Sequence, residues 1–92
     1  MMIVFGLIDP RSHQVAYVGW TAADYAAPEW VKFLHRTHQM QLRKGRRHEA
    51  WEALMQQPQL QAALLERTAD PQAKDRWIRV LREAGHPLLN KR

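Results

Sequence analysis

The chain has 92 residues, enough for one domain over 1–92 and too few for two. Its hydrophobic share of 46% and charged share of 25% exclude a disordered or low-complexity chain. Lys and Arg outnumber Asp and Glu by 14 to 9, so the net charge is +5 and an acidic partner is expected. No Cys is present, which excludes disulfides and Cys-based metal sites. The longest apolar stretch, residues 1–8, is too short to span a membrane, and we predict a cytoplasmic protein without a membrane partner.

The first twenty residues predict a β-hairpin. Residues 3–8 form a short apolar run with β-branched side chains, and residues 15–20 form a second such run. Between them, Asp9 and Pro10 favour a turn, because Asp can accept bonds from the turn backbone and Pro presets φ. Two β-prone runs around a short turn make an antiparallel hairpin.

Two helices are expected in the middle of the chain. After a loop over 22–27, apolar residues recur with roughly helical spacing at Trp30, Phe33, Leu34 and Met40. This pattern predicts a helix over 28–43, which Gly45 ends. A second helix is expected over 46–57, with apolar residues at Ala50, Trp51, Leu54 and Met55. Pro58 ends it.

The last third combines one ambiguous segment with one helix. Residues 60–65 favour a helix by their Gln and Ala content and a strand by their bounded apolar run. Asp70 as N-cap and Pro71 as first position predict a helix that ends at Gly85, followed by an extended tail over 86–92. Its apolar stripe is Ala73, Trp77, Val80, Leu81 and Ala84. The order of elements predicts an α+β fold, a small antiparallel sheet with an N-terminal hairpin flanked by helices.

The hairpin resembles the GIY-YIG nuclease domain at the triplet Tyr17-Val18-Gly19. The likeness continues in the same order through Trp77-Ile78 and Gly85 to Leu88-Leu89-Asn90, and so covers nearly the whole chain. It implies a GIY-YIG-like fold. It also implies a site where a strand Tyr, a helical Arg and His, and a Glu of the last helix act around one divalent cation at the scissile phosphate.

Residue by residue, the resemblance places remnants of that catalytic site at Tyr17, His38 and Asn90. His35 is the alternative to His38 for the helical His. These residues are the positions at which the chain keeps the side chains of the family's site.

At three other positions the chain departs from the family's site. Phe5 stands where the first motif ends in Tyr, and Lys74 stands at the position of the metal-binding Glu. The Arg position is Leu34 if His38 is the match, or Val31 if His35 is. Because a cation cannot ligate a metal and neither aliphatic residue can neutralise a phosphate, the resemblance implies a degenerate, inactive nuclease without a cofactor.

One alternative keeps catalysis. Asp75 lies one residue beyond Lys74, and Glu66 lies on another element. Either carboxylate would hold Mg²⁺ or Mn²⁺ only if the metal moved from the family's position. The protein would then be a metal-dependent endonuclease with a rearranged site.

A strongly basic segment lies between Glu29 and Glu49. It contains no acidic residue and six cations, namely Lys32, Arg36, Arg43, Lys44, Arg46 and Arg47. This run predicts a phosphate-binding surface, which Lys74 extends towards the former catalytic position. Nucleic acid, in particular DNA, is the expected partner. A protein-binding regulator or inhibitor that uses the same basic face against an acidic protein surface is the alternative.

Two further side-chain groups have more than one interpretation. His35 and His38 share a helix face at a spacing that suits a metal pair, but no Asp, Glu or Cys is near them in sequence, which favours a surface pair in a basic stripe. Three of the four Trp fall on apolar helical stripes and are expected in the core, namely Trp30, Trp51 and Trp77. Trp20 is either a core residue or an exposed one beside the former catalytic cleft, where it would stack a base or contact a protein.

Overall fold

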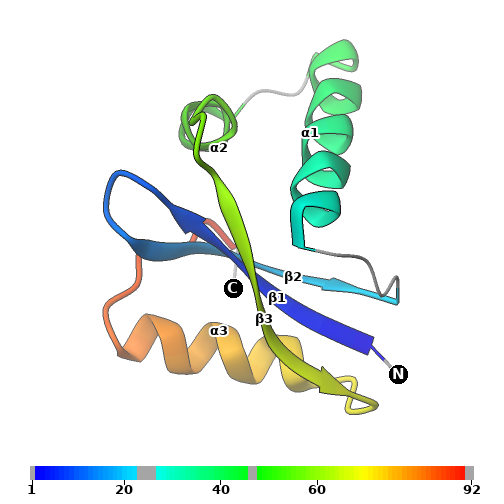
Figure 1. The fold of residues 1–92 in the computed structure, drawn as a ribbon, viewed down its shortest axis with the longest axis vertical. Helices are drawn as coiled ribbons and strands as arrows, with labels where there is room; N and C mark the ends of the chain where they lie inside the picture. The colour runs from blue at the N-terminus through cyan, green and yellow to red at the C-terminus, as the bar shows by residue number, and fades with distance from the viewer. Residues whose placement is uncertain (1, 23–26, 46–47, 91–92) are drawn as a thin grey trace.

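The computed structural model describes residues 2–22, 27–45 and 48–90. Within these residues the fold is α+β, with one antiparallel sheet in the strand order β2-β1-β3 and helices on both of its faces (Figure 1). The elements are β1 (Met2–Asp9), β2 (Gln14–Thr21), α1 (Ala27–Arg43), α2 (Glu49–Met55), β3 (Gln61–Thr68) and α3 (Ala73–Glu83). The predicted fold class with its N-terminal hairpin is confirmed.

The hairpin turn is closed by bonds to Asp9, as the sequence predicts. The backbone N–H of His13 donates to the Asp9 carbonyl at 2.8 Å, and the backbone N–H of Arg11 donates to the Asp9 carboxylate at 2.8 Å. The Arg11 guanidinium also donates to that carboxylate at 2.7 Å. The bonds from Arg11, the guanidinium's first, hold the pKa of the Asp9 carboxyl below its ordinary value.

A β-bulge in the hairpin decides where Tyr17 points. The register between β1 and β2 shifts between Leu7 and Ile8, so Ala16 has no direct partner on β1. Ala16 and Tyr17 consequently pack on the same face of the sheet instead of alternating. Tyr17 therefore lies on the face that α1 and α2 cover.

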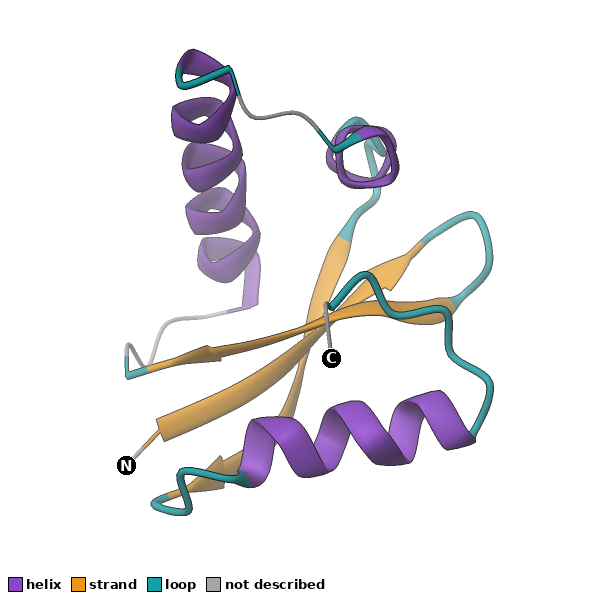
Figure 2. Cartoon of the chain, turned by 180° about the vertical axis from the view of Figure 1, so that it is seen from behind, coloured by secondary structure: helices purple, strands orange, loops and turns teal. Residues whose placement is uncertain are grey.

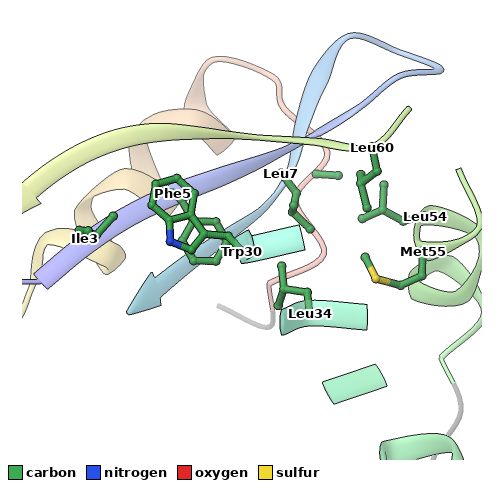
Figure 3. Packing of buried hydrophobic residues seen from close by; sticks show 9 residues of the cluster. Ile3, Phe5, Leu7, Trp30, Leu34, Leu54, Met55 and Leu60 are labelled. Atoms are coloured by element: carbon green, nitrogen blue, oxygen red, sulfur yellow. The ribbon is translucent and has the colours of Figure 1, made fainter. Parts of the chain in front are cut away.

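The sheet separates two apolar cores. The α1/α2 core contains Ile3, Phe5, Leu7, Ala16, Trp30, Leu34, Leu54, Met55 and Leu60. The α3 core contains Val4, Val18, Ala73, Ile78 and Leu81. Figure 1 shows α1 and α2 above the sheet and α3 below it. Figure 3 shows the ring of Phe5 against that of Trp30 in the first core, with centroids 5.2 Å apart and an angle of 13° between the planes.

The buried face of α1 differs from the predicted one. The helix spans the expected residues, and Trp30 and Leu34 are buried as predicted. Phe33 and Met40, however, are 54% and 56% exposed. Trp30, Leu34 and His38 follow one i, i+4, i+8 stripe, which faces the sheet. Phe33 and Met40 are exposed because they lie on a different side of the helix.

The histidines of α1 are also placed differently from the favoured interpretation. His38 is only 8% exposed, because it belongs to the inward stripe of α1. His35 is partly buried. A surface His pair is therefore wrong for His38.

The predicted stripe of α3 is correct in part. Ala73 and Leu81 are buried, together with Ile78, while Val80 is 48% exposed and Ala84 is exposed. The predicted helix is therefore present, but it begins later than the predicted N-cap Asp70.

The N-terminus of α3 lies two residues later than predicted. Gln72 is the N-cap and makes no side-chain cap bond. The Asp70 carboxylate instead accepts the backbone N–H of Gln72 at 2.9 Å, and so stabilises the turn that leads into the helix.

Both predicted glycine stops are found. Gly45 ends α1 with φ of +73°, and Gly85 ends α3 with φ of +93°. After α3, the N–H of His86 donates to the Leu81 carbonyl and that of Gly85 to the Arg82 carbonyl, each at 3.0 Å, which is a Schellman motif.

The second helix and the ambiguous segment are resolved by the structure. Of the predicted helix over 46–57, α2 covers only Glu49–Met55, with the His48 ring accepting the N–H of Trp51 at 3.2 Å, and Ala50 is exposed. Residues 46–47 lie outside the described residues. The segment 60–65 belongs largely to β3, because it pairs with β1 along its length.

No helix in the described part of the chain is both long and apolar enough to cross a membrane. The cytoplasmic location stays a prediction.

Candidate functional site

A cleft of about 650 Å³ lies where the first turns of α3 meet β2 and the C-terminal tail. Figure 2 shows the tail running back from the end of α3 to β2. The lining residues are Tyr17, Trp20, Pro71, Lys74, Asp75, Ile78, Leu89 and Asn90. The cleft thus contains side chains from three segments that are far apart in the sequence.

The helical period explains which residues of α3 and its leading turn face the cleft. Pro71, Lys74, Asp75 and Ile78 follow the i, i+3, i+4, i+7 spacing of one helix face. Ile78 is buried in the α3 core, which fixes the rotation of the helix about its axis. Lys74 lies one turn earlier on that face and so borders the cleft.

Asn90 joins the tail to the outer edge of β2. Its Oδ1 accepts the backbone N–H of Val18 at 2.8 Å, and its Nδ2 donates to the Val18 carbonyl at 2.9 Å. The Arg82 side chain donates to the backbone carbonyl of Asn90. The amide of Asn90 therefore pairs with the strand in the way that a neighbouring strand would, and its contacts are structural.

Two more bonds attach the tail to this edge. The N–H of Leu89 donates to the Ala16 carbonyl at 2.7 Å, and the N–H of Val15 donates to Nδ1 of His86 at 3.0 Å. Edge strands present unpaired backbone groups, and the tail satisfies several of those on β2. The tail is therefore a fixed wall of the cleft.

The two aromatic residues of the cleft come from opposite faces of β2. Tyr17 makes an edge-on contact with Trp51, with ring centroids 5.0 Å apart, and burial raises the pKa of its phenol. Trp20 is half-buried and packs against the α3 core while it also lines the cleft. Trp20 is thus partly a core residue that also borders the cleft, and its contact with a base or a protein stays a prediction.

The structure brings together three of the six positions that the resemblance relates to the family's site. Tyr17, Lys74 and Asn90 line the same cleft. His38 is not among the lining residues, since it is buried on α1 and lies on the other face of the sheet from α3.

The two substituted core positions do not face the cleft either. Phe5 is 3% exposed and stacks on Trp30, and Leu34 is buried in the same α1/α2 core. Val31, the other candidate for the Arg position, is partly buried against this core.

The charges of the cleft do not suit a divalent cation. Within residues 2–22, 27–45 and 48–90, no carboxylate forms an ion pair with Lys74, and Asp75 is the one carboxylate among the lining side chains. In the same ranges no cluster of three or more His, Asp or Glu residues is suited to hold a metal. The resemblance assigns the ligand position to Lys74, and a lysine does not fit the metal that the resemblance implies there.

Glu66 is engaged elsewhere. Its Oε1 accepts from the Arg76 guanidinium and from the Trp77 indole, each at 2.9 Å. Arg76 also donates to Asp70 at 2.8 Å. The bond from the Gln72 backbone, followed by that from Arg76, holds the pKa of Asp70 below its ordinary value. Glu66 therefore belongs to an ion network between β3 and α3 and does not line the cleft.

A basic surface, separate from the cleft, covers the outside of α1. Its exposed cations among the described residues are Lys32, Arg36, Arg43 and Lys44. Lys32 pairs with Glu29 at 3.2 Å, whereas the other three have no carboxylate partner in the described ranges. Arg46 and Arg47 lie outside those ranges. Since α1 and α3 lie on opposite faces of the sheet, we treat this α1 surface and the cleft as separate.

Part of the cleft was not predicted from the sequence. Pro71 was assigned only a role in starting a helix, and Ile78 and Leu89 were noted only as parts of the resemblance. The spacing of residues 71, 74, 75 and 78 is the signal that places them on one face, but it does not say what that face meets.

Comparison of the chain with models of known families, with curated proteins and with solved structures finds no match.

Proposed function

We propose that this protein binds nucleic acid on a GIY-YIG-like scaffold whose nuclease site has degenerated. The observation that carries the proposal is Lys74, a cation without a described ion-pair partner in the cleft that it shares with Tyr17 and Asn90. At this place the resemblance calls for a metal-binding carboxylate. A lysine there is suited to contact a phosphate and unsuited to hold a metal.

The surroundings of the cleft support binding without cleavage. A catalytic arrangement of the GIY-YIG type needs a metal ligand and a cation that neutralises the phosphate, both aimed at one point. Here the candidate positions for that cation, Leu34 and Val31, pack in or against the α1/α2 core. Phe5 has no hydroxyl and is buried. None of these three residues lines the cleft.

The α1 surface supplies further phosphate contacts in this proposal. Arg36, Arg43 and Lys44 are exposed and have no described carboxylate partner, so their charge is available to an acidic ligand. Contacts of cations with phosphates carry no sequence information by themselves. We therefore expect binding to DNA that depends strongly on salt and little on sequence.

Binding of labelled DNA over a series of salt concentrations tests the proposal. The triple variant Arg36→Gln, Arg43→Gln, Lys44→Gln should weaken binding and flatten the slope of log K against log salt by about 0.9 for each lost duplex phosphate contact. Lys74→Gln should also weaken binding. Arg79→Gln is the matched control for Lys74→Gln, because it removes an exposed α3 cation outside the cleft. Unchanged affinity and slope in folded triple and Lys74→Gln variants would contradict the proposal.

A second candidate function is binding to an acidic protein. Phe33 and Met40 are more than half exposed on the same helix as the unpaired cations. Apolar side chains among charges are typical of protein interfaces. A protein partner whose binding to the α1 surface is insensitive to competing DNA would favour this function over the first.

A further inference from the structure

We infer that the cleft takes one unpaired nucleotide, with its base stacked on Trp20 and its phosphate at Lys74. The inference rests on the proposed function and deepens it, because it names the form of nucleic acid that the cleft selects. A base inside a duplex has both faces covered by its neighbours, so it reaches Trp20 only after it leaves the stack. The protein should therefore prefer single-stranded DNA or RNA.

Trp20 is placed to stack a base. Its partly buried side chain packs against the α3 core, which contains Val4 and Val18, and it also lines the cleft. The packed part holds the indole in position, so little conformational freedom is left to lose when a ligand stacks on it. Every base has a flat aromatic face, and stacking on a fixed indole accordingly tolerates any sequence.

The dimensions and walls of the cleft suit a single nucleotide. Its volume of about 650 Å³ lies within the range of about 300–1,000 Å³ that is usual for small-ligand pockets. The apolar lining residues Ile78, Pro71 and Leu89 offer contacts to a base and a sugar. The tail wall is fixed by the bonds between Asn90 and Val18.

The cleft offers one cation to a phosphate. Lys74 is the one cation and Asp75 the one carboxylate among the described lining side chains. A single cation contacts one phosphate and carries no base information, so stacking on the aromatic side chain has to supply the preference for an unpaired nucleotide. Lys74 serves as a local contact to the phosphate of the stacked nucleotide.

Three labelled probes of equal length test the inference on the full chain: an oligothymidylate, an abasic strand with the same phosphates, and a mixed-sequence duplex. The wild type should bind oligothymidylate about tenfold or more tightly than the abasic strand, because stacking on an aromatic side chain contributes that much per base. It should bind the duplex more weakly than oligothymidylate. Oligothymidylate should also quench part of the tryptophan fluorescence.

Two variants locate the effect. Trp20→Leu keeps an apolar side chain against the α3 core and should remove the advantage of oligothymidylate over the abasic strand. Trp20→Phe keeps a ring and should retain most of that advantage, while the fluorescence quenching falls. Far-UV circular dichroism checks that each variant is folded, and the comparison of probes on the wild type needs no variant at all.

The outcomes separate the inference from the proposed function. Equal binding of oligothymidylate and abasic strand by the wild type would overturn the inference and leave nucleic-acid binding in place. Tighter binding of duplex than of oligothymidylate would also overturn the inference and leave nucleic-acid binding in place. If none of the three probes binds, the proposed function itself is wrong and the inference falls with it.

Discussion

The ring of Phe5 lies across Gly19, its partner in the β1–β2 ladder. A Cβ built on Gly19 would stand 2.1 Å from Cζ of that ring, well inside van der Waals contact. On its other side the ring stacks on Trp30, which is 5% exposed. The glycine of the Tyr17-Val18-Gly19 triplet is therefore required by packing in the α1/α2 core.

Gly19→Ala should destabilise the protein. Replacing a strand glycine by alanine is by itself favourable by roughly 0.5–1 kcal/mol, because glycine loses more backbone entropy. The overlap with Phe5 outweighs this gain, since overpacking a core costs about 1–3 kcal/mol. Urea denaturation monitored by circular dichroism measures the change.

A double-mutant cycle identifies the cause of that change. Phe5→Leu shortens the side chain that the new Cβ meets, so Gly19→Ala should cost much less in the Phe5→Leu background than in the wild type. The coupling energy should be about 0.5–3 kcal/mol. Additive effects of the two substitutions would show that the ring is not what excludes a larger residue at this position.

Asn90→Ala should loosen the end of the tail where it meets β2. The variant loses two hydrogen bonds to Val18, and each is worth about 0.5–1.5 kcal/mol. The free energy of unfolding should therefore fall by about 1–3 kcal/mol, and the amide proton of Val18 should exchange faster with solvent. Asn90→Asp retains the acceptor and lacks the donor, so its free energy of unfolding should lie between those of the wild type and Asn90→Ala. Unchanged exchange at Val18 in Asn90→Ala would show that the tail is held by other contacts.

The stability of the protein should fall as the pH drops through the carboxyl range. Bonds from the Gln72 backbone and from Arg76 lower the pKa of Asp70 below its ordinary value of 3.8. The unfolded state then binds the proton more tightly than the folded state does. Asp70 consequently stabilises the fold above pH 3.8, and this contribution is lost as the pH falls through its lowered pKa.

Urea midpoints of the wild type and Asp70→Asn, measured from neutral to acidic pH, check this expectation. The variant should be less stable at neutral pH, and the difference should shrink under strongly acidic conditions. A difference that does not depend on pH would mean that the charge of Asp70 has no part in it.

The wild type should not nick plasmid DNA with Mg²⁺ or Mn²⁺. Lys74→Glu alone should not restore cleavage, because Phe5 and Leu34 lie in the α1/α2 core and supply no catalytic group to the cleft. An arginine at position 34 would likewise enter that core. Plasmid nicking with and without a chelator measures the activity. Chelator-sensitive nicking by pure wild type that Asp75→Asn abolishes would instead support the alternative of a rearranged metal site.

The hairpin turn and the ends of α1 and α3 depend on neighbouring residues and were predictable from the sequence. The hairpin turn follows from Asp9, whose carboxylate and carbonyl accept bonds from residues two to four positions later. The ends of α1 and α3 follow from Gly45 and Gly85, because a positive φ is nearly free of strain only in glycine. In each case the interacting groups are close in the chain, so local chemistry is sufficient.

Burial was harder to predict, because it depends on what packs against an element. Phe33 and Met40 are as apolar as the buried residues of α1, yet they are exposed. The face of α1 that turns inward is set by the stacking of Trp30 on Phe5 of β1. Residues 60–65 have mixed propensities, and pairing with β1 decided that they form a strand.

The candidate site shows the same division. The resemblance named Tyr17 and Asn90 as remnants of a catalytic site and Lys74 as a departure from it. That the Asn90 amide pairs with the backbone of Val18, 72 residues earlier, depends on the path of the tail over the edge of β2. The position of Trp20 between the α3 core and the cleft depends on the docking of α3. Contacts between distant segments depend on which face of the sheet each helix packs against. No local pattern in the chain encodes that placement by itself.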